Sequence, residues 1–143
     1  MVQFDNQYRQ IKVKIVYYGP ALGGKTTCLQ HIHRVTDPQR RTRLYSLNTA
    51  SDRTLFFDLL SLNLGRIRGY RLTIQLYTVP GQVQYNATRR TVLAGADGVV
   101  FVADSQRNQH QANLQSFENL KENLDANGID PDTHPLVLQY NKR

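Results

Sequence analysis

Residues 19–26 read GPALGGKT, which matches the phosphate-binding pattern GxxxxGK followed by Ser or Thr. An apolar, strand-like run precedes this motif at 11–18, and apolar residues at helical spacing follow it at 25–35. Glycine lets such a loop turn successive N–H groups toward phosphate oxygens, and the next helix presents the positive end of its dipole to the same anion. The sequence therefore predicts a loop that binds the phosphates of a nucleotide, rather than an incidental glycine-rich turn.

Individual residues of this loop have expected roles. Lys25 is expected to reach the outer phosphates as a point charge, and the Thr26 hydroxyl to bind a Mg²⁺ ion that bridges them. The remaining backbone contacts to the phosphates are expected from Gly19, Ala21, Leu22, Gly23, Gly24 and Thr27.

Length and composition indicate one domain. The 143 residues are enough for a single core, and no apolar run approaches the roughly 20 residues that a membrane span needs. The polar first residues lack the layout of a secretory signal, so we expect a cytoplasmic protein. Cys28 is the single cysteine and is expected to be a small core residue.

The net charge of +7 arises from an excess of Lys and Arg in residues 1–96. These side chains would surround the phosphates, although a basic surface is also compatible with nucleic acid or acidic lipid. They are spread over several predicted elements, and no nucleic-acid-binding module accompanies them. A solvated basic face is therefore favoured, and no nucleic-acid partner is expected.

The order of predicted elements is that of an α/β fold. Strands are expected at 11–18, 55–62, 70–78, 98–103 and 136–140, with a short strand at 44–47, and helices at 25–35, 84–94 and 109–126. The last two long strands are nearly continuous apolar runs, which is typical of centrally buried parallel strands. A turn at 63–65 predicts an antiparallel hairpin, hence one antiparallel edge strand on a mostly parallel sheet. Core contacts of the last helix are expected from Leu114, Phe117, Leu120 and Leu124.

Three further motifs follow the loop in the order that nucleotide switches require. SDRT at 51–54 places Thr54 where its hydroxyl can complete a Mg²⁺ shell. TVPGQ at 78–82 places the Gly81 amide near a γ-phosphate and lets Gln82 orient the attacking water. Asn141 and Lys142 match the start of the base-recognition motif NKxD. Each motif alone is weak evidence, whereas their order and spacing together are strong evidence.

The chain resembles the Ras-like small GTPases, and more closely the bacterial MglA family of gliding-motility and cell-polarity GTPases. The resemblance spans about residues 4–143, and its most specific segments are KIVYYGPALGGKTT, SDRTLFFDLL, LYTVPGQVQYNATRR, GADGVVFVADSQ and QYNKR. It implies a Ras-like G domain, a three-layer P-loop NTPase sandwich that binds GTP and GDP, depends on Mg²⁺ and hydrolyses GTP slowly. It also implies regulation by a partner of the MglB type, which has a Roadblock/LC7 fold.

Carried over by position, the resemblance assigns phosphate and catalytic roles to Lys25, Gln82 and Arg53, the last as an internal arginine finger on the developing phosphoryl charge. It assigns Mg²⁺ to Thr26 and Thr54, and the guanine side of the site to Asn141 and Lys142. A solvated arginine is the alternative for Arg53.

The sequence departs from the Ras-like pattern at three places. Thr78 replaces the usual aspartate that contacts the Mg²⁺ shell, so metal affinity is expected to be modest. Ala21 replaces a glycine beside the γ-phosphate, so hydrolysis is expected to be slow. The sequence ends at Arg143, one residue before the guanine-binding aspartate, so we expect a single incomplete domain over 1–143 without its last strand and helix. A nucleotide-binding scaffold with little hydrolysis is the alternative function.

Overall fold

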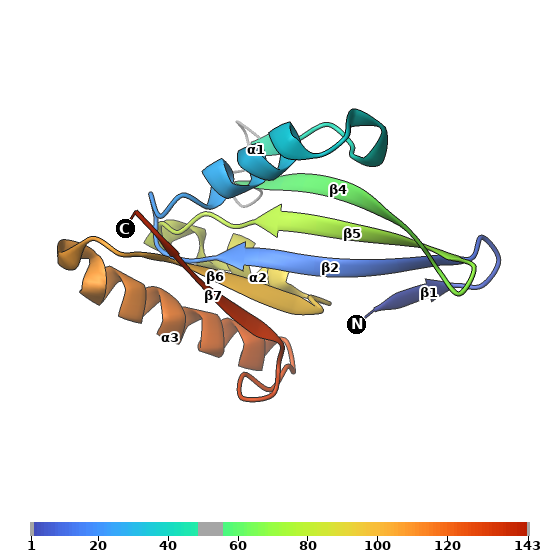
Figure 1. Ribbon diagram of the computed structural model, residues 1–143. Coiled ribbons are helices and arrows are strands. Elements are labelled where there is room, and N and C mark those ends of the chain that lie inside the picture. Colours follow the sequence, from blue (N-terminus) through green and yellow to red (C-terminus); the bar gives the residue numbers. More distant parts are fainter. Residues whose placement is uncertain (1, 49–55, 143) are drawn as a thin grey trace.

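The apolar run before the glycine-rich loop forms β2, a strand in the middle of a mixed sheet (Figure 1). The computed structural model describes residues 2–48 and 56–142. Strands in these residues are β1 (Gln3–Asp5), β2 (Gln10–Tyr18), β3 (Tyr45–Asn48), β4 (Phe56–Ile67), β5 (Tyr70–Thr78), β6 (Gly98–Asp104) and β7 (Leu136–Asn141). Helices are α1 (Lys25–Val35), α2 (Asn86–Leu93) and α3 (His110–Ala126), with short 3₁₀ helices at η1 (Pro38–Arg40), η2 (Val83–Tyr85) and η3 (Arg107–Gln109).

Parallel pairing places the predicted motifs at one edge of the sheet. The strand order is β3-β4-β5-β2-β6-β7, in which β2 is parallel to β5 and β6, and β7 is parallel to β6. The carboxyl ends of β2, β5 and β7 therefore point the same way, and ligand sites of open α/β sheets form beyond such ends. The segments at these three ends are GPALGGKT (19–26), PGQ (80–82) and the Asn141-Lys142 pair.

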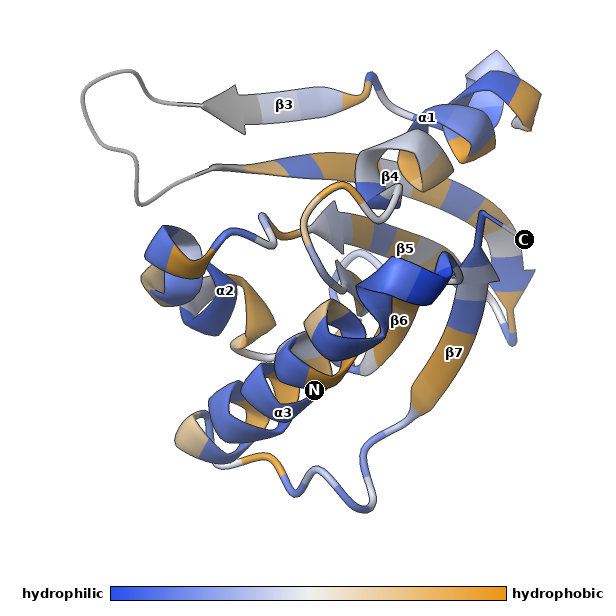
Figure 2. Cartoon of the chain, turned by 90° about the vertical axis from the view of Figure 1, so that its left-hand side faces the viewer, coloured by the Kyte–Doolittle hydropathy of each residue, from blue (hydrophilic) through white to orange (hydrophobic). Residues whose placement is uncertain are grey.

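Helices cover both faces of the sheet, which gives three layers (Figure 2). On one face, Leu29 of α1 packs in a cluster with Tyr17, Leu60, Leu76 and Val102 of four strands. On the other face, α2 and α3 pack on the sheet through a second buried cluster, which comprises Val16, Tyr18, Val79, Val92, Leu93, Ala96, Val99, Phe101, Ala103, Leu120 and Leu124. Neighbouring residues of β2 thus face opposite layers, as the period of a strand requires. The predicted α/β class and mostly parallel architecture are confirmed.

The antiparallel part of the sheet is larger than the sequence predicted. Both β3 and β4 run antiparallel to their neighbours, and β1 pairs antiparallel with β2. The turn expected at 63–65 is wrong, because β4 continues to Ile67 through an irregular register between Asn63 and Arg66. The chain reverses instead at Arg68 and Gly69, both at positive φ, as a two-residue hairpin turn that matches strand twist requires.

Two core predictions are also wrong. The apolar run at 136–140 is not centrally buried: β7 pairs with β6 on one side, and Val137 and Leu138 are 59% and 50% exposed. Leu114 of α3 is 48% exposed, whereas Leu120 and Leu124 are buried as expected. The predicted helix over 84–94 is divided into η2 and α2.

Among the described helices, none combines the length and apolar character that crossing a bilayer requires.

A pair of leucines on β4 tests the core. Leu60 is fully buried against α1, whereas Leu64 on the same strand is 49% exposed. Leu60→Ala is expected to lower the free energy of unfolding by about 2–5 kcal/mol, because it removes buried apolar contacts and leaves a cavity. Leu64→Ala is expected to change it by less than about 0.5 kcal/mol. Urea denaturation of both variants measures the difference, and equal losses would contradict the assigned core.

Candidate nucleotide-binding site

The glycine-rich loop ends on an uncapped helix. Gly24 precedes α1 with a φ of 98°, a left-handed value, and a Cβ there would lie 2.8 Å from the Asn141 Nδ2 atom. Among residues 2–48 and 56–142, no side chain caps the first turn of α1, and this turn carries no acidic residue. Its backbone N–H groups and its positive dipole end are thus directed at whatever occupies the loop, which is the arrangement that binds anions.

Lys25 lies buried beneath the same loop. Its Nζ atom donates to the Gly19 carbonyl at 2.9 Å and to the Pro20 carbonyl at 2.7 Å. Burial lowers the pKa of Lys25 to about 8, and the nearby charge of Arg89 contributes in the same direction. The ammonium is therefore held against backbone dipoles rather than against a carboxylate, and an anionic ligand would restore its usual pKa.

A buried carboxylate faces the loop from β4. The Asp58 Oδ2 atom accepts hydrogen bonds from the Thr26 hydroxyl at 2.7 Å and from the Thr78 hydroxyl at 2.8 Å. Its Oδ1 atom accepts from the Ser46 hydroxyl at 2.6 Å, and its own N–H donates to the Thr78 hydroxyl oxygen at 3.0 Å. Thr78, which stands where an aspartate was expected, thus lies against a carboxylate supplied by the neighbouring strand.

Sequence reasoning missed Asp58. The sequence signal for Asp58 is its spacing: positions 58, 60 and 62 lie on the same face of a strand, and the other two are Leu60 and Leu62. A carboxylate therefore occupies a position of β4 that points into the core. Such a carboxylate needs partners, since burying an unpaired charge is very unfavourable. Its three hydroxyl partners lie at the predicted metal position.

A cavity of about 330 Å³ joins these groups to the segment after β5. It is lined by Lys25 and Thr26 of α1, by Asp58 and Thr78 of the two strands, and by Gly81 and Gln82. Ala21, Leu22, Gly24 and Thr27, also predicted as site residues, line the same space. Gly81 packs so closely on the loop that a Cβ there would lie 2.2 Å from the Ala21 nitrogen.

The end of β7 contacts the other side of the loop. The Asn141 Nδ2 atom donates to the Gly23 carbonyl at 3.1 Å, and the Lys142 ammonium donates to the Leu22 carbonyl. Lys142 also pairs with the buried Asp104 carboxylate at 3.0 Å, a residue that the sequence did not single out. Burial opposes ionisation of Asp104, but the Gln106 N–H and Lys142 lower its pKa below the usual range.

The structure therefore brings together all the predicted site residues that it describes. Gly19 and Gly23 contribute carbonyls to Lys25 and Asn141, and the others line the cavity or adjoin it. Arg53 and Thr54 lie outside the described residues. Together, Thr26, Asp58, Thr78 and Ser46 offer hydroxyl and carboxylate oxygens, the ligand type that Mg²⁺ prefers.

A phosphate-type loop after a central parallel strand, an uncapped helix and an oxygen cluster on the adjacent strands define the class of P-loop proteins with a Ras-like G domain.

Comparison with known proteins identifies the family. The chain is 56% identical over 135 residues to the mutual gliding-motility protein MglA of Myxococcus xanthus (strain DK1622). The alignment covers 94% of the chain and 69% of that protein. No model of a known protein family matches the chain. The chain belongs to the MglA family of small GTPases.

The lowered pKa of Lys25 predicts that nucleotide affinity depends on pH. Bound phosphates hold Lys25 protonated, whereas in the free protein its pKa is about 8, so the complex carries more protons than the free protein above that pH. The affinity for GDP is expected to fall as pH rises through 8, approaching tenfold per pH unit. Calorimetry in two buffers of different ionisation enthalpy measures the proton uptake.

Lys14→Arg is the matched control for this pH dependence. Burial lowers the pKa of Lys14 as well, but its ammonium donates to the Ala94 carbonyl away from the loop. Lys14→Arg is expected to keep the full pH dependence of GDP affinity. If this variant lost the pH dependence, the assignment to Lys25 would be contradicted.

Proposed function

We propose that this chain is a molecular switch that binds GTP and GDP with Mg²⁺, hydrolyses GTP and acts in bacterial gliding motility or cell polarity. The observation that carries the proposal is the convergence of Lys25, Thr26, Asp58, Gly81 and Gln82 on one cavity beside the glycine-rich loop. The similarity to a gliding-motility protein supports the cellular process.

The loop and the end of β7 are proposed to bind the two ends of the nucleotide. Lys25 and the amides of α1 would hold the phosphates, since both already face the loop without a side-chain anion. Asn141 and Lys142 would hold the base side, and Asp104 fixes Lys142 in place for that task.

Thr26 and Asp58 are proposed to hold the Mg²⁺ ion, with Thr54 as a further ligand by resemblance. When bound, Mg²⁺ supplies positive charge that offsets the charge on the phosphates. Asp58 makes the site more anionic than Thr78 alone would, so the proposed metal affinity is higher than Thr78 alone predicts.

Hydrolysis is proposed to use Gln82 to orient the attacking water and the Gly81 amide to contact the γ-phosphate. Arg53 is proposed as the arginine that stabilises the developing charge. Ala21 lines the cavity beside Gly81, so its methyl group crowds the position of the γ-phosphate and favours slow turnover.

The regulator is proposed to be an MglB-type protein with a Roadblock/LC7 fold, and the location to be the cytoplasm. Both proposals rest on the similarity of the chain to MglA.

Gln82→Leu tests the hydrolysis step. Single-turnover GTP hydrolysis by the purified chain is expected to fall roughly 10–100-fold, because leucine cannot orient water, while GTP affinity stays within about twofold. Gln84→Leu, the same change at an exposed glutamine two residues on, is expected to keep the parental rate. Binding without turnover in the parent would support the scaffold alternative.

Asp58→Asn tests the proposed metal site. The amide keeps one oxygen for the hydroxyl partners but loses the charge, so the Mg²⁺ concentration that stabilises bound GDP is expected to rise about 10–100-fold. Fluorescent GDP release at graded Mg²⁺ measures this. Asp97→Asn is the control, because the Asp97 carboxylate accepts from the Lys14 N–H at 2.8 Å and does not line the cavity, so this variant is expected to leave the Mg²⁺ requirement unchanged.

A further inference from the structure

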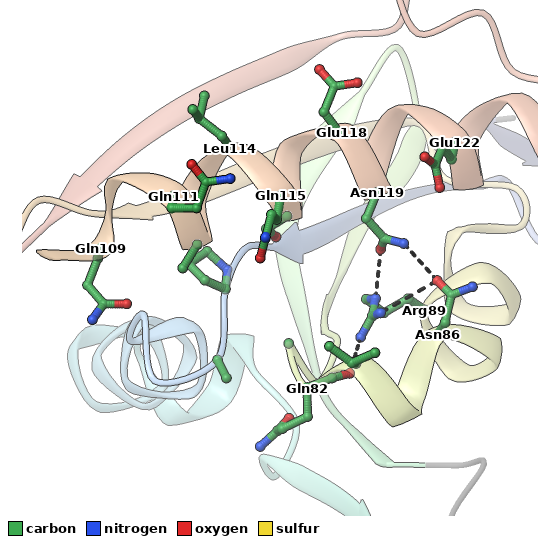
Figure 3. Close-up of a pocket in the computed structure, with 16 residues that line it drawn as sticks. Gln82, Asn86, Arg89, Gln109, Gln111, Leu114, Gln115, Glu118, Asn119 and Glu122 are labelled. Carbon is green, nitrogen blue, oxygen red and sulfur yellow. Dashed lines mark hydrogen bonds between the residues drawn. The ribbon is translucent and has the colours of Figure 1, made fainter.

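A second, larger cavity lies on the other side of the PGQ segment (Figure 3). Its volume is about 840 Å³, and Ala21, Gly81 and Gln82 line both this cavity and the nucleotide cavity. The Pro80-Gly81-Gln82 segment therefore separates two spaces, one facing Lys25 and one facing α3.

Arg89 of α2 donates hydrogen bonds to this segment from the side of α3. Arg89 is 5% exposed, and its Nη1 atom donates to the Pro80 carbonyl at 2.9 Å and to the Gln82 carbonyl at 2.6 Å. Its Nε atom donates to the Asn119 side-chain oxygen at 2.9 Å. Over residues 2–48 and 56–142, no ion pair of Arg89 with a carboxylate is found. Burial of a cation that only carbonyl and amide oxygens satisfy is unfavourable, which calls for a reason other than stability.

The two bonds fix the Pro80–Gly81 and Gln82–Val83 peptide planes. In a trans peptide, the carbonyl and the following N–H point in opposite directions, and no described peptide bond is cis. Because the Pro80 carbonyl points to Arg89, the Gly81 N–H points away from Arg89. The Gln82 carbonyl is held in the same way, and Figure 3 shows the Gln82 side chain extending away from α3.

An amide network holds the guanidinium in turn. Asn119 donates to the Asn86 side-chain oxygen at 2.9 Å, and the fully buried Asn123 donates to the same oxygen at 2.9 Å. The Tyr18 hydroxyl, one residue before the glycine-rich loop, donates to the Asn119 side-chain oxygen. The orientation of Arg89 is thus tied to α2, α3 and the end of β2.

We propose that Arg89 is a positioning residue for GTP hydrolysis, which holds the Gly81 amide and Gln82 in the orientation that meets the γ-phosphate and the attacking water. This inference rests on the proposed GTPase function. It requires the forked donor geometry of arginine, since lysine carries the same charge but cannot hold two carbonyls and Asn119 in one plane.

Arg89→Lys tests the proposal, and Arg90→Lys is the matched control. Arg90 is the next residue of α2 and is exposed, with no bond to the PGQ segment among those described. Its one described side-chain bond, to Asn123 of the amide network at 3.1 Å, needs a single donor, which lysine also supplies. In Arg89→Lys, the rate of single-turnover GTP hydrolysis is expected to fall about tenfold or more. The ratio of the affinity for a non-hydrolysable GTP analogue to the affinity for GDP is expected to fall about fivefold. GDP affinity is expected to stay within about twofold. Arg90→Lys is expected to match the parent in hydrolysis rate, affinity ratio and GDP affinity.

A purely structural role gives a different pattern. In that case Arg89→Lys would lower the melting temperature and weaken the binding of GDP and of the GTP analogue equally. Either that result or an unchanged rate of GTP hydrolysis overturns the proposal. Asn119→Ser, which loosens Arg89 without removing it, is expected to show the same selective loss if Arg89→Lys does not fold.

Amide NMR of the nucleotide-free protein separates this inference from the proposed function. If the parent does not turn over GTP, the proposed function fails, but the Gly81 and Gln82 amides are still expected to lose order in Arg89→Lys and to keep it in Arg90→Lys. Unchanged order in both variants overturns the positioning role.

Discussion

Parallel pairing of β2 with β5 and β6 is the constraint on which the site depends. It directs the ends of these strands to one edge, so that segments distant in sequence meet around the glycine-rich loop. β7 is parallel to β6, so Asn141 at its end lies at the same edge, where its side chain donates to the Gly23 carbonyl. The contacts of Asp58 with Thr26 and of Asn141 with Gly23 therefore join residues that are far apart in the sequence, and the sheet register brings them together.

The charges at this edge are arranged for an anion. Lys25 is buried against two carbonyls, and the charge of Arg89 further lowers its pKa, so two cations share a region that offers them only neutral partners among the described residues. The nearby carboxylate, Asp58, is satisfied by hydroxyl groups rather than by these cations. Because the cations and the carboxylate have neutral hydrogen-bond partners, neither charge is neutralised, which suits phosphates on one side and a metal ion on the other.

Sequence reasoning succeeded where the signal is local. The phosphate loop and the helix at 25–35 were predictable, because glycine spacing and helical periodicity act over a few residues. Asp58 was not, since its role depends on pairing between β4 and β5 that sets it beside Thr78. The turn at 63–65 failed because Asn63, Leu64 and Gly65 form an irregular stretch of one long strand. The apolar run of β7 was expected to be central, whereas among the described strands it pairs only with β6.

The choice of asparagine around Arg89 has an electrostatic consequence. A carboxylate at Asn86 or Asn119 would satisfy the guanidinium equally well and would gain a charge-assisted bond. It would also cancel the positive field of Arg89 and add a negative charge close to the cavity that Lys25 lines. Side-chain amides satisfy the donors without that charge. Asn119 accepts from Arg89 and donates to the Asn86 oxygen, to which Asn123 also donates, so the three amides form a connected network. The protein thus keeps an unneutralised cation fixed beside the PGQ segment, which is a costly arrangement for folding alone and a favourable one for a bound triphosphate.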